Sequence, residues 1–312
     1  MKYFLAIIAA IILIFNTVAE AKYKFAAPNP TTEFEAMDFA PVYPTYSWEP
    51  LPNTEFYLVQ ILNSEGKVIR ELMNTESLNR VTDWQPFTEV GKFYWRVCVV
   101  DKNKNQLGEW SEQKLIRVTA PVTFAALGDS ITHGGANFIP AGQISCQWET
   151  FCDVPIKNIG RSGDTTAMMI ERFERDVLPF QPKLLLIMGG VNDIREGAKA
   201  EDVIKNYEIL RDKCTANNII PVFCQITPMN NQKMTERGIY FVKDWLFERA
   251  KINRWIRQNN GVYTGVENRA GELPETWTPD GLHPDLRGKM LIGKRIEEFL
   301  KKNFHNLVIE SR

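Results

Sequence analysis

The stretch TFAALGDSITHGG, Thr123 to Gly135, decides the fold. It starts as an apolar run and ends in a glycine-rich turn that contains Ser130. Two later runs, PKLLLIMGG (182–190) and NIIPVFCQITP (218–228), are also apolar without alternation. Such runs are typical of strands that helices cover on both faces. Because longer amphipathic segments separate these runs, we expect a parallel, doubly wound α/β sheet over residues 121–312.

The amphipathic segments predict helices around this sheet. Four apolar residues recur at spacings of four, three and four, which places them on one helix face: Val203, Tyr207, Leu210 and Cys214. A second helix is expected over 242–257. The last helix should begin near Pro284, because proline is favoured in the first turn. Its buried face is expected to contain Ile292, Ile296, Phe299 and Leu300.

Residues 22–120 have a different pattern, which predicts an all-β sandwich. Aromatic and β-branched runs with partial alternation indicate short strands at 44–50, 55–63 and 92–101. About seven such strands would form a sandwich of the immunoglobulin or fibronectin III-like kind. The segment 91–112 resembles the late hairpin of fibronectin type III-like modules, and Trp48 is expected to be a buried core aromatic. This region can bind glycan, pack against the rest of the chain or act as a spacer, and the sequence does not choose among these roles.

The first residues have the features of a secretory signal peptide. Lys2 precedes an apolar run from Tyr3 to Phe15, and Ala19-Glu20-Ala21 has the small-x-small pattern of a cleavage site. A retained membrane anchor is the alternative, but the run is shorter than the ~20 residues that a spanning helix needs. We therefore expect a signal peptide over 1–21, a mature chain from Lys22 without stable membrane insertion, and a periplasmic, cell-surface or secreted protein.

Composition excludes several partner classes. The net charge is -1, with 44% apolar and 24% charged residues, so neither nucleic acid nor an anionic membrane surface is an expected partner. The five cysteines have no zinc-ligand spacing, and we expect neither a cofactor nor a metal ion. Export would permit a disulfide, and Cys146 with Cys152 is the candidate pair. Oligomeric state stays open.

A serine hydroxyl needs a base before it can act as a nucleophile. The segment PDGLHPD (279–285) offers His283, with Asp280 three residues earlier. This spacing permits an Asp–His–Ser relay to Ser130. By itself, this spacing is more typical of a surface turn with a helix cap. His133 is closer to Ser130 in sequence, but it belongs to the glycine-rich turn, and we expect a structural or rim residue there.

Attack on an ester also requires donors for the developing oxyanion. The glycine-rich segment NIGRSGDTT (158–166) can direct the Gly163 N–H into a site, and GGVND supplies the Asn192 amide. The helix that follows the first segment is expected to bury Met169, Phe173 and Val177. Each segment alone is also typical of an ordinary strand-to-helix turn.

Together, the four segments form one ordered pattern. Gly-Asp-Ser, Asn-x-Gly-x-x-Gly-x-Thr, Gly-x-Asn-Asp and Asp-x-x-His follow one another within about residues 122–303, and this order resembles the SGNH (GDSL-type) hydrolase family. The resemblance implies Ser130 as nucleophile and Asp280–His283 as relay. It also implies an oxyanion hole from the N–H groups of Ser130 and Gly163 with Asn192, a three-layer α/β/α flavodoxin-like fold and no metal cofactor.

The substrate is less constrained than the chemistry. Export, a sandwich region and the lack of a basic amphipathic helix favour a secreted serine esterase that removes O-acetyl groups from a carbohydrate. The expected partner is an acetylated glycan or another small ester. A lysophospholipase, short-chain thioesterase or arylesterase is the enzymatic alternative, and a non-catalytic glycan-binding protein is the alternative from another class. Trp148, residues 228–234 and Trp277 are expected near the mouth of the site, although each pattern is equally typical of a packing residue.

Overall fold

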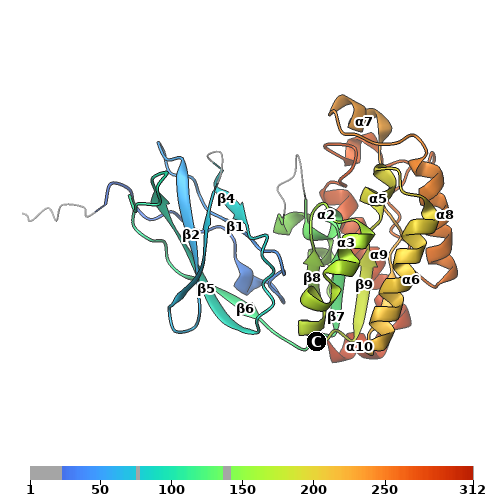
Figure 1. The fold of residues 1–312 in the computed structure, drawn as a ribbon, viewed down its shortest axis with the longest axis horizontal. Helices are drawn as coiled ribbons and strands as arrows, with labels where there is room; N and C mark the ends of the chain where they lie inside the picture. The colour runs from blue at the N-terminus through green and yellow to red at the C-terminus, as the bar shows by residue number, and fades with distance from the viewer. Residues whose placement is uncertain (1–22, 75–77, 136–141, 312) are drawn as a thin grey trace, which may run out of the picture.

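The computed structural model describes residues 23–74, 78–135 and 142–311. The signal peptide predicted for residues 1–21 and the expected start at Lys22 lie outside this part of the chain. An antiparallel β region and an α/β region stand side by side in the molecule (Figure 1).

The α/β region is built on a parallel sheet in the order β10-β9-β7-β8. Its strands are β7 (Phe124–Gly128), β8 (Ile156–Gly160), β9 (Leu184–Met188) and β10 (Ile220–Phe223). The prediction of β7, β9 and β10 as strands is confirmed. The sequence did not predict β8, because Lys157 and Asn158 interrupt its apolar pattern although both are buried.

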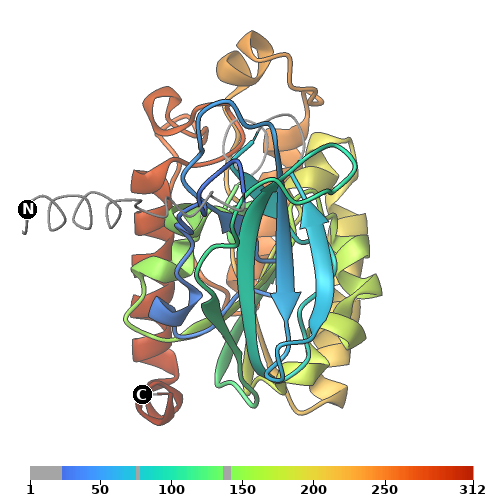
Figure 2. The ribbon, with the colours of Figure 1, turned by 90° about the vertical axis from the view of Figure 1, so that its left-hand side faces the viewer.

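Helices cover both faces of this sheet, which gives three layers. The helices are α2 (Ser130–His133), α3 (Thr166–Glu171), α4 (Phe173–Asp176), α5 (Val191–Arg195), α6 (Ala200–Ala216), α7 (Asn231–Glu236), α8 (Trp245–Gln258), α9 (Leu286–Asn303) and α10 (His305–Glu310). Figures 1 and 2 show α3 and α6 on one side of the sheet and α9 on the other. Within the described residues, no helix combines the length and apolarity needed to cross a membrane.

The predicted helix faces agree with the observed burial. All four residues of the periodic set on α6 are buried, and so are Met169, Phe173 and Val177 around α3 and α4. The last helix starts slightly later than predicted, because the Asp285 carboxylate accepts the N–H groups of Arg287 and Gly288 and so caps α9. On this helix Phe299 is only partly buried, whereas Ile292, Ile296 and Leu300 are fully buried.

The N-terminal region contains six named strands among its described residues. They are β1 (Thr45–Ser47), β2 (Phe56–Leu62), β3 (Val68–Met73), β4 (Arg80–Thr82), β5 (Gly91–Val100) and β6 (Lys114–Val118). Four form an antiparallel sheet in the order β3-β2-β5-β6, and β1 pairs with β4. Trp48 is buried as predicted. The fibronectin III-like character and the division near residue 120 stay predictions.

A short segment, residues 40–43, joins the two regions. The Val42 N–H donates to the Asn158 carbonyl at 3.0 Å, and the Val42 carbonyl accepts from the Phe87 N–H at 2.8 Å. Lys157 is fully buried and donates from Nζ to the Ala40 carbonyl at 2.5 Å. The segment thus covers the outer edge of β8, which would otherwise expose unpaired backbone groups. One hydrophobic cluster includes side chains from both regions, so the two regions share a core.

All five cysteines are free thiols. The candidate pair Cys146 and Cys152 is therefore not bonded in this structure, and the Cys152 thiol donates to the Gly293 carbonyl at 3.2 Å. No group of three or more His, Cys, Asp or Glu side chains within 23–74, 78–135 and 142–311 is arranged to hold a metal ion.

Candidate active site

Ser130 begins α2, directly after β7, at the carboxyl end of the parallel sheet. The Asp129 carboxylate accepts the Ile131 N–H at 2.9 Å and caps this one-turn helix. The helix packs tightly onto the strand ends. A Cβ at Gly128 would lie 2.3 Å from Thr132 Oγ1, and a Cβ at Gly160 would lie 2.3 Å from the backbone nitrogen of His133. Only glycine at both positions lets α2 approach so closely.

Asp280, His283 and Ser130 form a continuous line of hydrogen bonds. Asp280 Oδ2 is 2.6 Å from His283 Nδ1, and His283 Nε2 is 2.8 Å from Ser130 Oγ. The three residues are 0%, 1% and 2% exposed, respectively, so bulk water does not compete strongly for these contacts. The loop predicted to bring a base to the serine does bring His283 to Ser130.

The Asp280 carboxylate is held in its ionised form. Its other oxygen, Oδ1, accepts the backbone N–H groups of Leu282 at 2.9 Å and His283 at 2.8 Å. Burial raises the pKa of Asp280, but the hydrogen bonds and charge interaction with His283 outweigh it, so the pKa lies below its ordinary value. An ionised Asp280 keeps the proton of His283 on Nδ1, which leaves Nε2 free to accept the proton of Ser130.

The predicted oxyanion donors follow the strands on either side of β7. Gly163 comes after β8, and Asn192 comes after β9 as the second residue of α5. Gly163 has a φ of +90°, and a Cβ built there would meet nothing within 4 Å, so its backbone borders open space. Within the described part of the chain, the backbone N–H groups of Ser130 and Gly163 donate to no protein acceptor.

Asn192 and its neighbour fasten the Gly163 loop to α5. Asn192 Nδ2 donates to the Asp164 carbonyl at 2.9 Å, which leaves its second N–H for another acceptor. The Asp193 carboxylate accepts the Thr166 backbone N–H at 3.0 Å and the Thr166 hydroxyl at 2.6 Å. These bonds hold the end of the loop in one position relative to α5.

His133 is a buried structural residue, as expected from its position in the turn. Its Nε2 is 2.8 Å from the Tyr43 carbonyl, which can only accept, so Nε2 bears the proton. Nδ1 then accepts from the Ser162 N–H at 3.2 Å. Burial lowers the pKa of His133 to about 4 and keeps the ring neutral near pH 7. The ring joins the 40–43 segment to the Gly163 loop.

One prediction about the mouth of the site is wrong. Trp148 is fully buried, and its Nε1 donates to Thr132 Oγ1 at 3.2 Å, so this side chain belongs to the core beneath α2. In the segment 228–234, Met229 and Asn230 are buried as well, and Asn230 caps α7. Trp277 is partly exposed, with the Arg287 guanidinium 5.7 Å from its ring centroid. Trp148 therefore packs in the core and does not line the mouth of the site.

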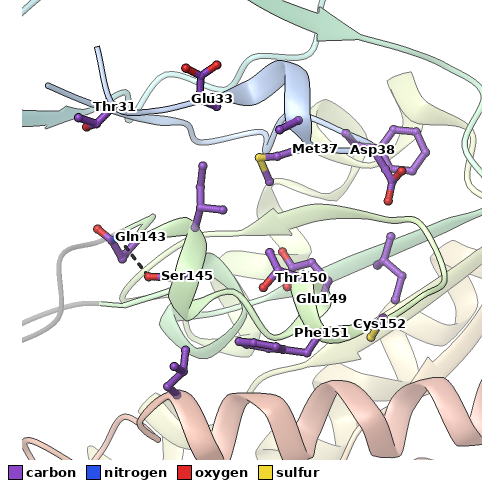
Figure 3. Close-up of a pocket in the computed structure, with 15 residues that line it drawn as sticks. Thr31, Glu33, Met37, Asp38, Gln143, Ser145, Glu149, Thr150, Phe151 and Cys152 are labelled. Atoms are coloured by element: carbon purple, nitrogen blue, oxygen red, sulfur yellow. Dashed lines mark hydrogen bonds between the residues drawn. The ribbon is translucent and has the colours of Figure 1, made fainter. Parts of the chain in front are cut away.

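A cavity of about 710 Å³ lies between the N-terminal region and the segment that precedes β8. Figure 3 shows Thr31, Glu33 and Met37 on one side and Thr150 and Cys152 on the other. The residues that border this cavity include neither the Asp280–His283–Ser130 relay nor the candidate oxyanion donors. It is therefore distinct from the space that Gly163 borders.

Sequence reasoning missed a buried charge network behind the Gly163 loop. Arg172 donates to the Asp164 carboxylate from Nε and to Asp176 Oδ2 from Nη1, the second at 3.2 Å. The i,i+4 spacing of Arg172 and Asp176 was a signal that could have found one half of it. No comparable signal in the sequence pointed to Tyr43, whose hydroxyl donates to Asp176 Oδ2 at 2.6 Å.

A three-layer fold with a serine at the end of the first parallel strand defines a class of α/β hydrolytic proteins. The model of the GDSL-like Lipase/Acylhydrolase family matches residues 126–291, which is more than half of the chain. The chain belongs to this family, whose members hydrolyse ester bonds. No curated protein matches it.

Several solved structures resemble part of this chain. A GDSL-like lipase from Bacteroides thetaiotaomicron is 22% identical, covers 58% of this chain and 88% of its own, and has a TM-score of 0.46. The lipase/acylhydrolase from Enterococcus faecalis is 20% identical over 58% of this chain and 96% of its own, with a TM-score of 0.46. A carbohydrate acetylesterase family member from Sinorhizobium meliloti is 17% identical, covers 58% of this chain and 95% of its own, and has a TM-score of 0.45.

Proposed function

We propose that the protein is an exported serine esterase that removes O-acetyl groups from a carbohydrate through an acyl-enzyme. Ser130 is the nucleophile, His283 the general base and Asp280 the residue that orients it. The observation that supports this assignment best is the unbroken line from Asp280 Oδ2 through His283 to Ser130 Oγ, with contacts of 2.6 and 2.8 Å. Both distances suit proton transfer in the direction that nucleophilic attack requires.

In the first step, Ser130 Oγ attacks the acetyl carbonyl carbon while its proton moves to His283 Nε2. The carbonyl oxygen becomes an oxyanion, which the N–H groups of Ser130 and Gly163 and the free N–H of Asn192 stabilise. Collapse of this intermediate breaks the bond to the sugar oxygen. His283 returns its proton to that oxygen, the sugar leaves as an alcohol, and Ser130 remains acetylated.

In the second step, water replaces the sugar. His283 Nε2 takes a proton from the water, whose oxygen attacks the acetyl carbon of the acyl-enzyme. The same donors bind the second oxyanion, the bond to Ser130 Oγ breaks, and Oγ recovers a proton from His283. The products are acetate and the starting enzyme, so the cycle needs no cofactor.

The carbohydrate assignment rests on two features. The predicted signal peptide would bring the chain to extracellular or periplasmic glycans. Trp84 of the N-terminal region, which the sequence reasoning did not consider, is 48% exposed and its ring centroid lies 5.6 Å from that of His133. A rigid aromatic face close to the α2 turn is suited to stacking against a sugar ring.

The test uses the mature protein from Lys22 and two measurements. A fluorophosphonate probe should label Ser130 in folded protein, and Ser130→Ala should abolish the labelling. Acetate release should then be strongest for one member of a panel of acetylated xylan, pectin, mannan and sialylated glycans. Nitrophenyl esters from acetate to octanoate complete the test, because activity that rises toward octanoate would favour a lysophospholipase or thioesterase. Folded protein without labelling would favour a glycan-binding protein.

A further inference from the structure

We infer that Tyr43, in the N-terminal region, is a positioning residue for the oxyanion half of the active site. Its hydroxyl completes the buried ion network that holds the Gly163 loop and the chain just before Ser130. This inference rests on the proposed function of the same site. It gives the N-terminal region a role in catalysis that neither its fold nor its distance in sequence would suggest.

The connection from Tyr43 to the site is a short series of contacts. The Tyr43 hydroxyl donates to Asp176 Oδ2 at 2.6 Å, and the same oxygen accepts from Arg172 Nη1 at 3.2 Å. Arg172 in turn donates from Nε to the Asp164 carboxylate and from Nη2 to the Gly128 carbonyl, the latter at 3.0 Å. Asp164 follows Gly163, and Gly128 lies two residues before Ser130. One guanidinium therefore fixes both sides of the oxyanion hole.

Burial makes the network sensitive to each of its members. Tyr43, Arg172, Asp164 and Asp176 are each at most 3% exposed. The fifth member, Arg175, is exposed and donates to the Tyr43 hydroxyl at 2.9 Å and to Asp176 Oδ1 at 2.7 Å. A buried charge that loses a partner is costly, so the remaining groups are expected to shift to find another one. Burial, followed by the hydrogen bond to Asp176, raises the pKa of Tyr43 to about 12. The hydroxyl hence remains a donor at any pH at which an esterase would be assayed.

Tyr43 also contacts the Gly163 loop through its ring and its backbone. The ring centroid lies 5.7 Å from the Arg161 guanidinium carbon and 5.8 Å from that of Arg172, distances that suit cation–π contacts. The Tyr43 carbonyl accepts the Nε2–H of His133, which accepts from Ser162. Replacement of Tyr43 by phenylalanine preserves the ring and backbone contacts, so it isolates the effect of the hydroxyl.

The decisive comparison is Tyr43→Phe against Tyr57→Phe in the full mature protein. Tyr57 is also buried, and its hydroxyl accepts the Leu51 N–H at 2.8 Å and contacts Thr54 Oγ1 at 2.5 Å, but it has no contact with the network. We expect Tyr43→Phe to lower kcat about 10-fold with KM within 2-fold, since a small misplacement of transition-state donors mainly slows the chemical step. Tyr57→Phe should retain the wild-type kcat. The pH–rate profile should have the same shape in all three proteins, because the relay is unchanged.

The outcomes separate the inference from the proposed function. Wild-type kcat in folded Tyr43→Phe, or a change in KM alone, would overturn the positioning role while the esterase assignment stands. A wild-type protein that hydrolyses no ester would overturn both. If Tyr43→Phe does not fold, Asp176→Asn provides the same readout. This variant keeps the shape and the acceptor oxygen of Asp176 but removes the charge that holds Arg172, so kcat should again fall about 10-fold at constant KM.

Discussion

The two halves of the candidate site are built in different ways. The relay half needs only the α/β region: Asp280 and His283 are three residues apart on one loop, and their hydrogen bonds to each other and to Ser130 measure 2.6 and 2.8 Å. The oxyanion half depends on a loop that is held from behind by buried charges, the last of which contacts Tyr43 of the N-terminal region. The first half combines the local Asp280–His283 pair with one long-range contact inside the α/β region, from His283 to Ser130, whereas the second also requires a contact from the N-terminal region.

This difference separates two kinds of variant. Changes in the relay half should affect proton transfer and nucleophilic attack directly. Changes in the oxyanion half should reduce stabilisation of the transition state by degrees, according to how far each residue lies from the donors. The predictions below test this ranking.

The largest effect is expected for Ser130→Ala. Without Oγ no acyl-enzyme can form, and ester hydrolysis should fall on the order of 10⁴-fold or more, to the rate that the remaining donors sustain with water. Ser145→Ala is the matched control, because Ser145 is exposed and its hydroxyl accepts a hydrogen bond from the Gln143 side chain, away from the relay. Initial rates with nitrophenyl acetate measure both. Comparable hydrolysis by Ser130→Ala and wild type would exclude this serine as the nucleophile.

A smaller loss is expected for Asn192→Ala. Removal of one oxyanion donor should lower kcat on the order of 100- to 1,000-fold with little change in KM. Asn79→Ala is the control, since Asn79 Nδ2 also donates to a backbone carbonyl, that of Trp48, at 2.8 Å in the N-terminal region. Steady-state kinetics at saturating substrate separate kcat from KM. A loss of less than about 3-fold would mean that Asn192 only fastens the Asp164 carbonyl and does not contact the oxyanion.

The sequence predicted the relay half well and the oxyanion half only in part. Ser130 and Asn192 each follow an apolar run, and parallel strands bring their carboxyl ends together at one edge. Their proximity was therefore predictable. The place of Gly163 at that edge and the approach of His283 were expected only from the ordered pattern of four motifs, because β8 was not predicted as a strand. The support from Tyr43 was not predictable, because a single tyrosine in the irregular segment that precedes β1 belongs to no periodic pattern. Trp148 was misplaced for a related reason: a tryptophan beside polar residues has the same pattern whether it packs inward or lines a cleft.

The coupling of the 40–43 segment to the site also predicts a pH dependence of stability. Burial lowers the pKa of His133 from 6.5 to about 4, and the positive charges of Arg172, Lys289 and Arg161 add to the shift. Between these values the unfolded chain binds a proton that the folded protein does not, so stability falls as the pH drops below 6.5. From pH 6.5 to pH 5 the free energy of unfolding should fall by ~2 kcal/mol, at ~1.4 kcal/mol per pH unit.

Urea unfolding of wild type and His133→Gln at pH 7 and pH 5 measures the contribution of His133 to the pH dependence of the free energy of unfolding. The variant should be less stable at pH 7, because it loses the hydrogen bond to the Tyr43 carbonyl. The difference in free energy of unfolding between the two proteins should be ~2 kcal/mol smaller at pH 5, since only the wild type takes up a proton at His133 when it unfolds. Burial raises the pKa values of Asp129 and Glu149 to about 7, but these carboxyl groups are common to both proteins and cancel in the difference. Parallel stability curves would show that His133 is not the group responsible.

The smallest effect should distinguish substrate binding by the N-terminal region from its positioning role. Trp84→Ala removes an exposed ring beside His133 but no member of the charge network. Loss of one stacking contact of ~1 kcal/mol should raise KM for an acetylated oligosaccharide about 5-fold and leave kcat unchanged. Nitrophenyl acetate, which has no sugar to stack, should show no change. Trp110→Ala is the control, because its ring stacks on Arg96 within the N-terminal region, at 4.4 Å. If Trp84→Ala instead lowers kcat for both substrates, Trp84 acts through His133 on the Gly163 loop, and the N-terminal region serves the oxyanion half alone.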